Sequence, residues 1–169
     1  MKKLHSVQDL YTEFIKDIYH AEVMLIPELQ FFVSNCEAPQ LKRTLQRQLT
    51  TTRTHVSQLE DILETLDADL LDEHCRTMKS MIIESKELVE RCDNGMLTER
   101  AIVGSLHRIT HCLVTVYQML ISMADELNFA DQKQILEENL EQEILFDKQI
   151  SAYGFNIIFN AFNLQQKLT

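Results

Sequence analysis

The sequence predicts an all-α protein built on a four-helix bundle, with an additional helix in a long crossover and a short C-terminal helix. Its 169 residues include only 3 glycines and 2 prolines, so few positions interrupt a helix. Apolar residues recur every three or four positions along most of the chain, which is the period of an amphipathic helix. We expect one domain over residues 1–169, with a core at 6–152 and a tail at 153–169.

The first helix is expected to begin near Ser6, because Asp9 follows three residues later and completes a loose capping box. An apolar stripe follows, and Glu22 falls inside that stripe. Pro27 is expected to bend the helix, since a proline cannot donate a backbone hydrogen bond. The helix is expected to end within residues 35–39.

The second helix is expected over residues 40–66, with His55 flanking its apolar stripe. A shorter helix is expected from Leu71 to Cys92, ending where Gly95 can adopt a left-handed cap. Two parallel bundle helices need a long crossover, whereas antiparallel neighbours need only a short loop. Residues 67–97 are long enough to be that crossover.

The two remaining bundle helices are expected after Glu99 and after Asn128. An apolar row in the first runs over residues 102–127. The second carries Glu143 and Asp147, four residues apart, in its apolar stripe. This helix therefore presents two acids where leucines are expected.

The tail after Gly154 has large apolar residues at helical spacing, namely Phe155, Ile158, Phe159 and Phe162. Left exposed, these side chains would form an apolar patch. The tail is expected either to contact a second chain or another protein partner, or to fold back over the end of the bundle.

Charge and cysteine usage narrow the functional classes. The net charge of −10 disfavours nucleic acids and anionic membranes as partners. The sequence has no apolar run long enough for a membrane span and no secretory signal pattern. The 4 cysteines form no metal-type cluster, which favours reduced thiols and a cytoplasmic location.

The sequence also gives little support for several enzyme classes. It has no glycine-rich phosphate loop, no nucleophile elbow and no Ser-His-Asp order. A hydrolase, a kinase or a dehydrogenase is therefore not expected, and we predict no catalytic residues.

Glu22, Glu143 and Asp147 are the sharpest chemical feature, because a buried unpaired carboxylate costs several kcal/mol, roughly. Inward carboxylates and histidines from facing helices build di-metal sites in such bundles. The alternative is that each acid lies at the edge of its stripe and is solvated or paired with a lysine or arginine.

His107 and His111 are spaced i, i+4 and share one helix face, as two histidines that chelate a metal would. Their face lies beside the apolar row, and the sequence indicates no third ligand nearby. A structural or solvated pair is the expected interpretation.

Several motifs, taken in order, resemble one known family. The segment Asp17-Ile18-Tyr19-His20-Ala21-Glu22 resembles the D-x-Y-x-A-E opening of the YciE/YciF-type ferritin-like family of bacterial stress-associated proteins. Weaker matches follow in the later helices, at His55-Val56, Leu59-Glu60, Cys75, Met78, Leu140, Glu143 and Asp147. The resemblance covers residues 6–152.

The resemblance implies a ferritin-like bundle, a homodimer and a carboxylate-rich metal site between the helices. Glu22 and Glu143 match the family's ligands, and His55 matches a position that is sometimes histidine. Asp147 completes the candidate metal set of Glu22, His55, Glu143 and Asp147. The family's remaining acids correspond to neutral residues here, at Thr50 or Thr51, Thr110, Leu113 and Gln142.

Three functions remain open at this stage. The first is a non-catalytic or weakly metal-binding bundle protein, stress-associated, with a degraded di-metal site. The second is an oxidoreductase or iron-handling protein that binds iron or another divalent metal as cofactor. The third is a helical module that binds a protein partner through its tail.

Overall fold

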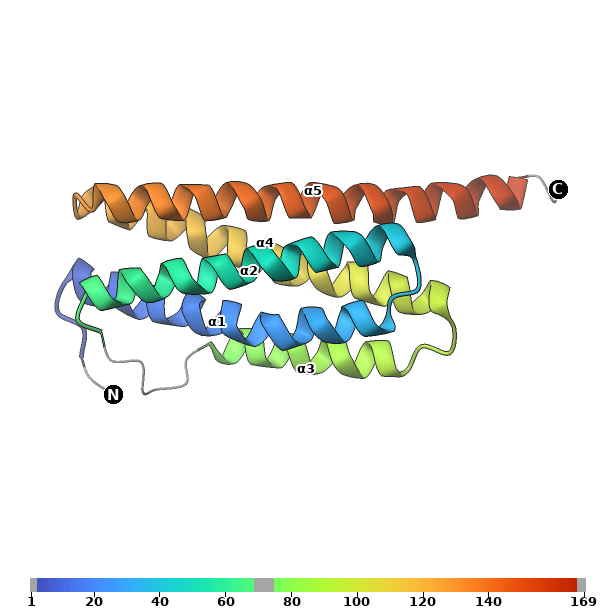
Figure 1. Ribbon diagram of the computed structural model, residues 1–169, viewed down its shortest axis with the longest axis horizontal. Coiled ribbons are helices and arrows are strands. Elements are labelled where there is room, and N and C mark those ends of the chain that lie inside the picture. The colour runs from blue at the N-terminus through green and yellow to red at the C-terminus, as the bar shows by residue number, and fades with distance from the viewer. Residues whose placement is uncertain (1–2, 69–74, 167–169) are drawn as a thin grey trace.

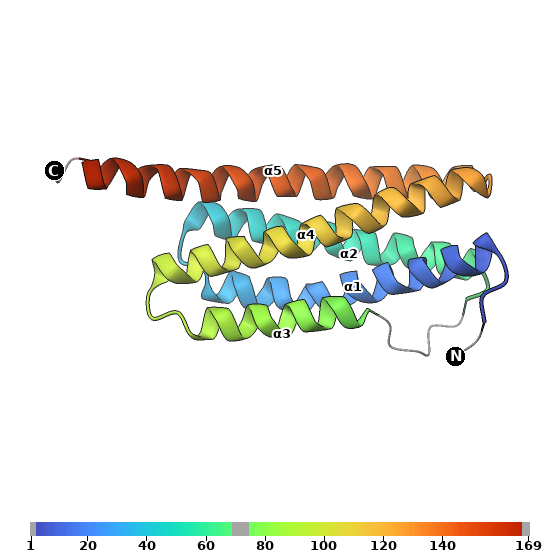
Figure 2. The same cartoon turned by 180° about the vertical axis from the view of Figure 1, so that it is seen from behind.

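The computed structural model describes residues 3–68 and 75–166, with side chains described as far as residue 153. These residues form five helices and no strand. The helices are α1 (Val7–Asn35), α2 (Pro39–Thr65), α3 (Arg76–Glu90), α4 (Gly95–Glu126) and α5 (Ala130–Gln166). Helices α1, α2, α4 and α5 form the bundle, and α3 packs on the outside against α1 and α4 (Figures 1 and 2). The expected all-α four-helix bundle is confirmed.

The bundle consists of two antiparallel pairs, α1 with α2 and α4 with α5. Helices α2 and α4 run in the same direction, and the crossover that joins them contains α3 (Figure 1). The additional helix of the crossover is therefore confirmed. Among the described helices, none is long and apolar enough to cross a membrane.

The start of α1 follows its capping signal. The backbone N–H of Asp9 donates to Ser6 Oγ at 3.0 Å, and the N–H of Ser6 donates to Asp9 Oδ2 at 3.1 Å. This reciprocal pair satisfies two donors that the first turn of a helix leaves free. Pro27 lies inside the helix, as expected.

Two boundaries in the crossover differ from expectation. The expected start of the short helix at Leu71 lies outside the described residues, and α3 begins at Arg76 because Cys75 adopts a left-handed φ of 59°. Gly95 does not form a left-handed cap but begins α4, with Asn94 capping the backbone N–H of Leu97. A Cβ at Gly95 would lie 2.7 Å from Glu37 Oε2, the end of a flexible, exposed side chain that can move away.

The tail is helical, but it continues α5 without a break through Gly154 to Gln166. The helix projects past the end of the bundle and does not fold back over it (Figures 1 and 2). The apolar side chains expected to form a contact there, Phe155 to Phe162, lie outside the described side chains.

The interior is mostly apolar, with a few buried polar side chains among the apolar ones. Tyr11, Leu29, Phe32, Leu106 and Leu120 are fully buried, and burial of each large apolar side chain contributes about 1.5–3 kcal/mol. Buried polar side chains from α1, α2 and α5 interrupt this packing, including Glu22, His55 and Glu143. They form the candidate functional site.

Candidate functional site

The structure brings Glu22, His55 and Glu143 together in the bundle interior. Each side chain is 0% exposed, and they come from α1, α2 and α5 respectively. One ligand-type atom from each lies within 4.8 Å of the other two. These three members of the predicted metal set therefore share one site, and the alternative that Glu22 and Glu143 are solvated at the edge of their stripes is wrong.

Both nitrogens of His55 face oxygen acceptors. Nδ1 lies 3.1 Å from Glu22 Oε1, and Nε2 lies 3.1 Å from Gln142 Oε1. A neutral imidazole has one N–H and can donate to only one of these oxygens. The doubly protonated imidazolium satisfies both contacts, and it places a positive charge beside Glu22.

Electrostatics favour this charged form. Burial alone would lower the pKa of His55, because it disfavours the cation. The hydrogen bond to Glu22, together with the charges of Glu22 and Glu143, outweighs burial and raises the pKa above its ordinary value. Glu143 Oε1 lies 3.7 Å from His55 Nδ1.

Glu143 is held mainly in its neutral form. Burial, and then the nearby charge of Glu22, raise its pKa to about 8, although His55 and Gln48 act in the opposite direction. Gln48 Nε2 donates to Glu143 Oε1 at 2.6 Å. The raised pKa values of Glu143 and His55 both favour the protonated forms of these two groups.

Tyr117 of α4 completes the network by donating its hydroxyl hydrogen to Glu22 Oε1 at 2.9 Å. Burial, followed by the charges of Glu22 and Glu143, raises the pKa of Tyr117 well above its ordinary value. The phenol therefore stays protonated and remains a donor. The Glu22 carboxylate is stabilised by both Tyr117 and His55.

The fit to a pair of metal ions is poor. Glu22 Oε2 and Glu143 Oε2 have no hydrogen-bond partner among the described residues, so each could face a cation. However, a di-metal centre of this fold draws about six carboxylate and imidazole ligands from all four helices. On α4 the positions where the sequence resemblance implies acids, Thr110 and Leu113, are buried but carry no acid. Two carboxylates and one imidazole do not supply two metal ions.

The remaining departures from the family lie toward the surface. Gln142 and Thr50 are exposed, and Thr51 is half-buried. Gln142 still reaches inward to His55. An acid at this position could be a ligand, whereas the amide accepts a hydrogen bond from the imidazolium without adding charge.

Asp147 does not join this site. Its side chain is 25% exposed, and Oδ1 lies 3.0 Å from His107 Nδ1 and 3.1 Å from His111 Nε2. Four residues advance a helix by about 40° beyond one full turn, so Asp147 is rotated away from the direction of Glu143. The sequence indicates no third ligand near His107 and His111, but in the structure α5 brings the carboxylate of Asp147 beside both imidazoles.

Sequence reasoning missed Gln48, which lies in the interior and binds Glu143. It also missed Glu28, a fully buried acid whose pKa burial raises to about 7, although Lys86 at 3.5 Å partly opposes this rise. A strict alternation of three- and four-residue steps through α2 would have found Gln48. It runs through Leu41, Leu45, Gln48, Thr52, His55, Leu59 and Ile62, all of which are buried.

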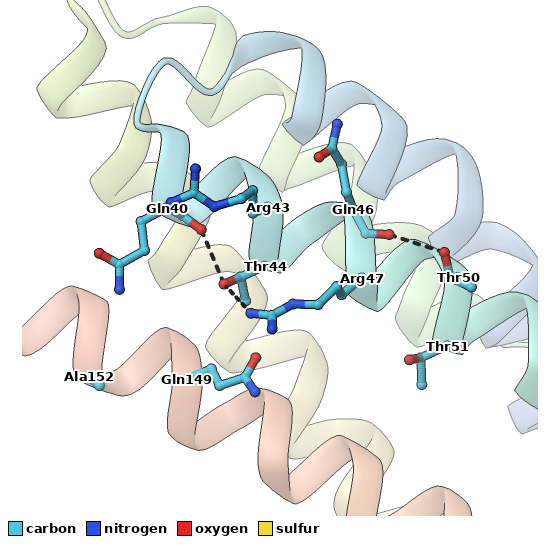
Figure 3. Close-up of a pocket in the computed structure, with 9 residues that line it drawn as sticks. All are labelled: Gln40, Arg43, Thr44, Gln46, Arg47, Thr50, Thr51, Gln149 and Ala152. Atoms are coloured by element: carbon cyan, nitrogen blue, oxygen red, sulfur yellow. Dashed lines mark hydrogen bonds between the residues drawn. The ribbon is translucent and has the colours of Figure 1, made fainter.

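A groove of about 880 Å³ lies over α2 and α5, on the outside of the bundle (Figure 3). Its side chains come from the N-terminal half of α2 and from α5 (Figure 3). The lining residues are Gln40, Arg43, Thr44, Gln46, Arg47, Thr50, Thr51, Gln149 and Ala152. None of these is an Asp, Glu, His or Cys, so the lining offers no carboxylate, imidazole or thiol for metal binding or acid–base chemistry.

Comparisons with known proteins agree with the fold. A family model described as "Domain of unknown function (DUF892)" matches residues 6–161. Protein YciF of Escherichia coli K12 is 20% identical over 154 residues, covering 90% of this chain and 93% of that protein. The crystal structure of the E. coli stress protein YciF superposes with a TM-score of 0.86 at 19% identity, covering 92% of this chain and 98% of that one.

A second solved structure is equally similar. It is described as YcfI, a putative structural protein from Rhodopseudomonas palustris. The TM-score is 0.84 at 22% identity, covering 89% of this chain and 96% of that one. At these identities the two structures establish the fold alone.

The protonated site predicts that the free energy of unfolding falls as pH rises through the neutral range. Glu143 has an ordinary pKa of 4.5 and a folded pKa of about 8, so the folded protein binds a proton that the unfolded chain has lost. The raised pKa of His55 also makes the free energy of unfolding fall with pH. Its contribution is lost as the pH rises through the pKa of His55 in the folded protein. Urea unfolding between about pH 5 and pH 8 should show this decline, with Glu143 contributing up to about 1.4 kcal/mol per pH unit.

The Glu143→Gln variant is the control for this decline, because the amide cannot ionise and its oxygen can still accept from Gln48. Its free energy of unfolding should fall less steeply than that of the parent protein over the same range. The raised pKa of Glu28 contributes equally to both proteins and cancels in the comparison. Equal slopes for the two proteins would contradict a protonated Glu143.

Proposed function

The chain belongs to the DUF892 family, and from that premise we propose that it is a non-catalytic ferritin-like bundle protein with a degraded di-metal site. In that site, protons on His55 and Glu143 balance the buried charges in place of metal ions. The observation that carries the proposal is the position of His55 between the oxygens of Glu22 and Gln142. Its imidazolium occupies the place where a metal ion would balance the buried acids. The bundle is then complete without a cofactor.

The names of two relatives support a structural, stress-associated role. One is a stress protein and the other a putative structural protein. We extend that role to this chain, together with a homodimeric state and a cytoplasmic location. In this proposal the protein acts through its shape and surface, and the projecting end of α5 is the segment available to a second chain or to a protein partner.

A metal-binding function is the second candidate, and one observation favours it. The unpartnered Oε2 atoms of Glu22 and Glu143 belong to a cluster whose ligand-type atoms lie within 4.8 Å of one another. For a metal to bind there, His55 must lose a proton and give up its contact with Glu22 or Gln142. The cluster would then offer three ligands, which suits one ion and leaves no shell for a second.

Two isosteric substitutions separate the roles of the buried acids. Glu22→Gln removes the anion that balances His55, and breaking a buried ion pair in this way costs about 3–5 kcal/mol. Glu143→Gln replaces a neutral acid by a neutral amide and should change the free energy of unfolding at neutral pH by less than about 1 kcal/mol. Urea unfolding of the two variants measures the difference. A larger loss for Glu143→Gln than for Glu22→Gln would reverse the assigned charges.

Anaerobic loading with ferrous iron tests the function itself. The proposal predicts that the iron retained per chain, measured by mass spectrometry on untagged protein, is the same for the parent and for Glu22→Gln and Glu143→Gln. Comparing variants removes any contribution from ions bound elsewhere. About two irons per parent chain, lost in Glu22→Gln, would establish a di-iron centre and overturn the proposal.

A further inference from the structure

We propose that His107, His111 and Asp147 form a binding site for one divalent transition-metal ion of the zinc class, at the surface between α4 and α5. The site is separate from the buried Glu22, His55 and Glu143 cluster and shares no residue with it. It does not depend on the proposed function of that cluster.

The three side chains converge from two helices on one point. His107 and His111 are one turn apart on α4, and they reach Asp147 Oδ1 on α5 at 3.0 Å and 3.1 Å. His107 uses Nδ1 and His111 uses Nε2, so the two imidazoles approach the same oxygen with different edges. Their rings meet nearly at right angles, with centroids 6.0 Å apart.

The backbone positions of these residues are set by packing. Each follows directly after a buried residue, since His107 follows Leu106 and Asp147 follows Phe146. His111 likewise follows buried Thr110. Helices α4 and α5 are packed side by side, which fixes the separation of the ligands across the two helices. The arrangement is therefore built into the bundle and does not depend on a loop.

The separations suit a metal after a small adjustment. Zinc binds histidine nitrogen and carboxylate oxygen at about 2.0–2.1 Å, and tetrahedral geometry then places neighbouring ligands about 3.3–3.4 Å apart. The observed 3.0 Å and 3.1 Å must lengthen by about 0.3 Å. His107 is 32% exposed and His111 is 67% exposed, so both rings have room to move outward.

Ligand chemistry selects the class of ion. Two imidazole nitrogens suit zinc, iron, nickel and copper, whereas magnesium and calcium prefer oxygen ligands alone. Two histidines and one carboxylate leave a fourth position open, and here that position faces solvent, so water can fill it. The contrast with the interior is clear, because there both nitrogens of the only imidazole are already engaged and an ion would lose all its water.

Protonation sets the conditions for binding. Each imidazole must be neutral to offer a lone pair, so metal binding competes with protons and weakens at low pH. Without a metal, His107 Nδ1 and His111 Nε2 both lie within hydrogen-bonding distance of Asp147 Oδ1. His107 Nδ1, His111 Nε2 and Asp147 Oδ1 can thus bind one metal ion together. The net charge of −10 favours the binding of a cation.

Isothermal titration of untagged protein with Zn²⁺ at neutral pH tests the site, with Co²⁺ absorption as a readout of coordination geometry. We expect one Zn²⁺ per chain and a visible Co²⁺ spectrum of the tetrahedral type. His111→Ala and Asp147→Asn should each weaken Zn²⁺ binding at least about tenfold, since each removes one of three protein ligands. His111 is exposed, so its substitution should leave the melting temperature nearly unchanged.

His5→Ala is the matched control, because it removes an exposed histidine far from the site in sequence and should leave Zn²⁺ binding unchanged. Glu22→Gln should also leave it unchanged, which separates this site from the interior. No binding by the parent protein, or binding insensitive to His111→Ala and Asp147→Asn, would overturn the inference. Zn²⁺ binding lost in Glu22→Gln but kept in His111→Ala would instead place the ion in the core and contradict the proposed function.

Discussion

The buried ion pair between His55 and Glu22 is the interaction on which the interior depends. It links α1 to α2, and the contacts to Gln142 and Tyr117 extend it to α5 and α4. A buried charge is tolerated only when it is paired and hydrogen-bonded, so each member of this network requires the others. Glu143 fits beside the pair because it carries a proton, and Gln48 fits because it donates to that acid.

This constraint accounts for the small number of acids in the interior of the bundle. A di-metal centre balances the negative charges of many carboxylates with two dications. A bundle without the ions must therefore also have fewer buried carboxylates. Thr110 and Leu113 stand on α4, and Gln142 on α5, where the resemblance noted in the sequence implies acids. Two acids remain, and one imidazolium and one proton balance them.

Much of the fold could be predicted from the sequence, because periodicity and scarce glycine and proline report directly on helices. The capping box at Ser6, the crossover helix and the burial of Glu22 and Glu143 all follow from local patterns. The buried face of α2 is harder to predict from the sequence. The apolar Leu49 and Val56 are only half-buried, while the polar Gln48 and His55 occupy the core. When the buried positions of a helix are polar, an assignment from hydrophobicity alone places its buried face one residue away from the true one.

The surface cluster of His107, His111 and Asp147 shows a different limit of prediction from the sequence. The spacing of His107 and His111 is local and visible in the sequence, but Asp147 meets them only through the pairing of α4 with α5. The periodicity of α5 gives the rotation of Asp147 away from Glu143, but it does not give the residues of α4 that Asp147 contacts. Charged residues at the edge of a stripe therefore need the tertiary structure before a role can be assigned.

The most direct test of the central claim is the protonation state of His55, measured by side-chain ¹⁵N NMR at neutral pH. Our account predicts a proton on both ring nitrogens, with resonances that persist when the protein is treated with a chelator. A single protonated nitrogen on His55, or a shift of its resonances when metal is removed, would contradict an interior balanced by an imidazolium.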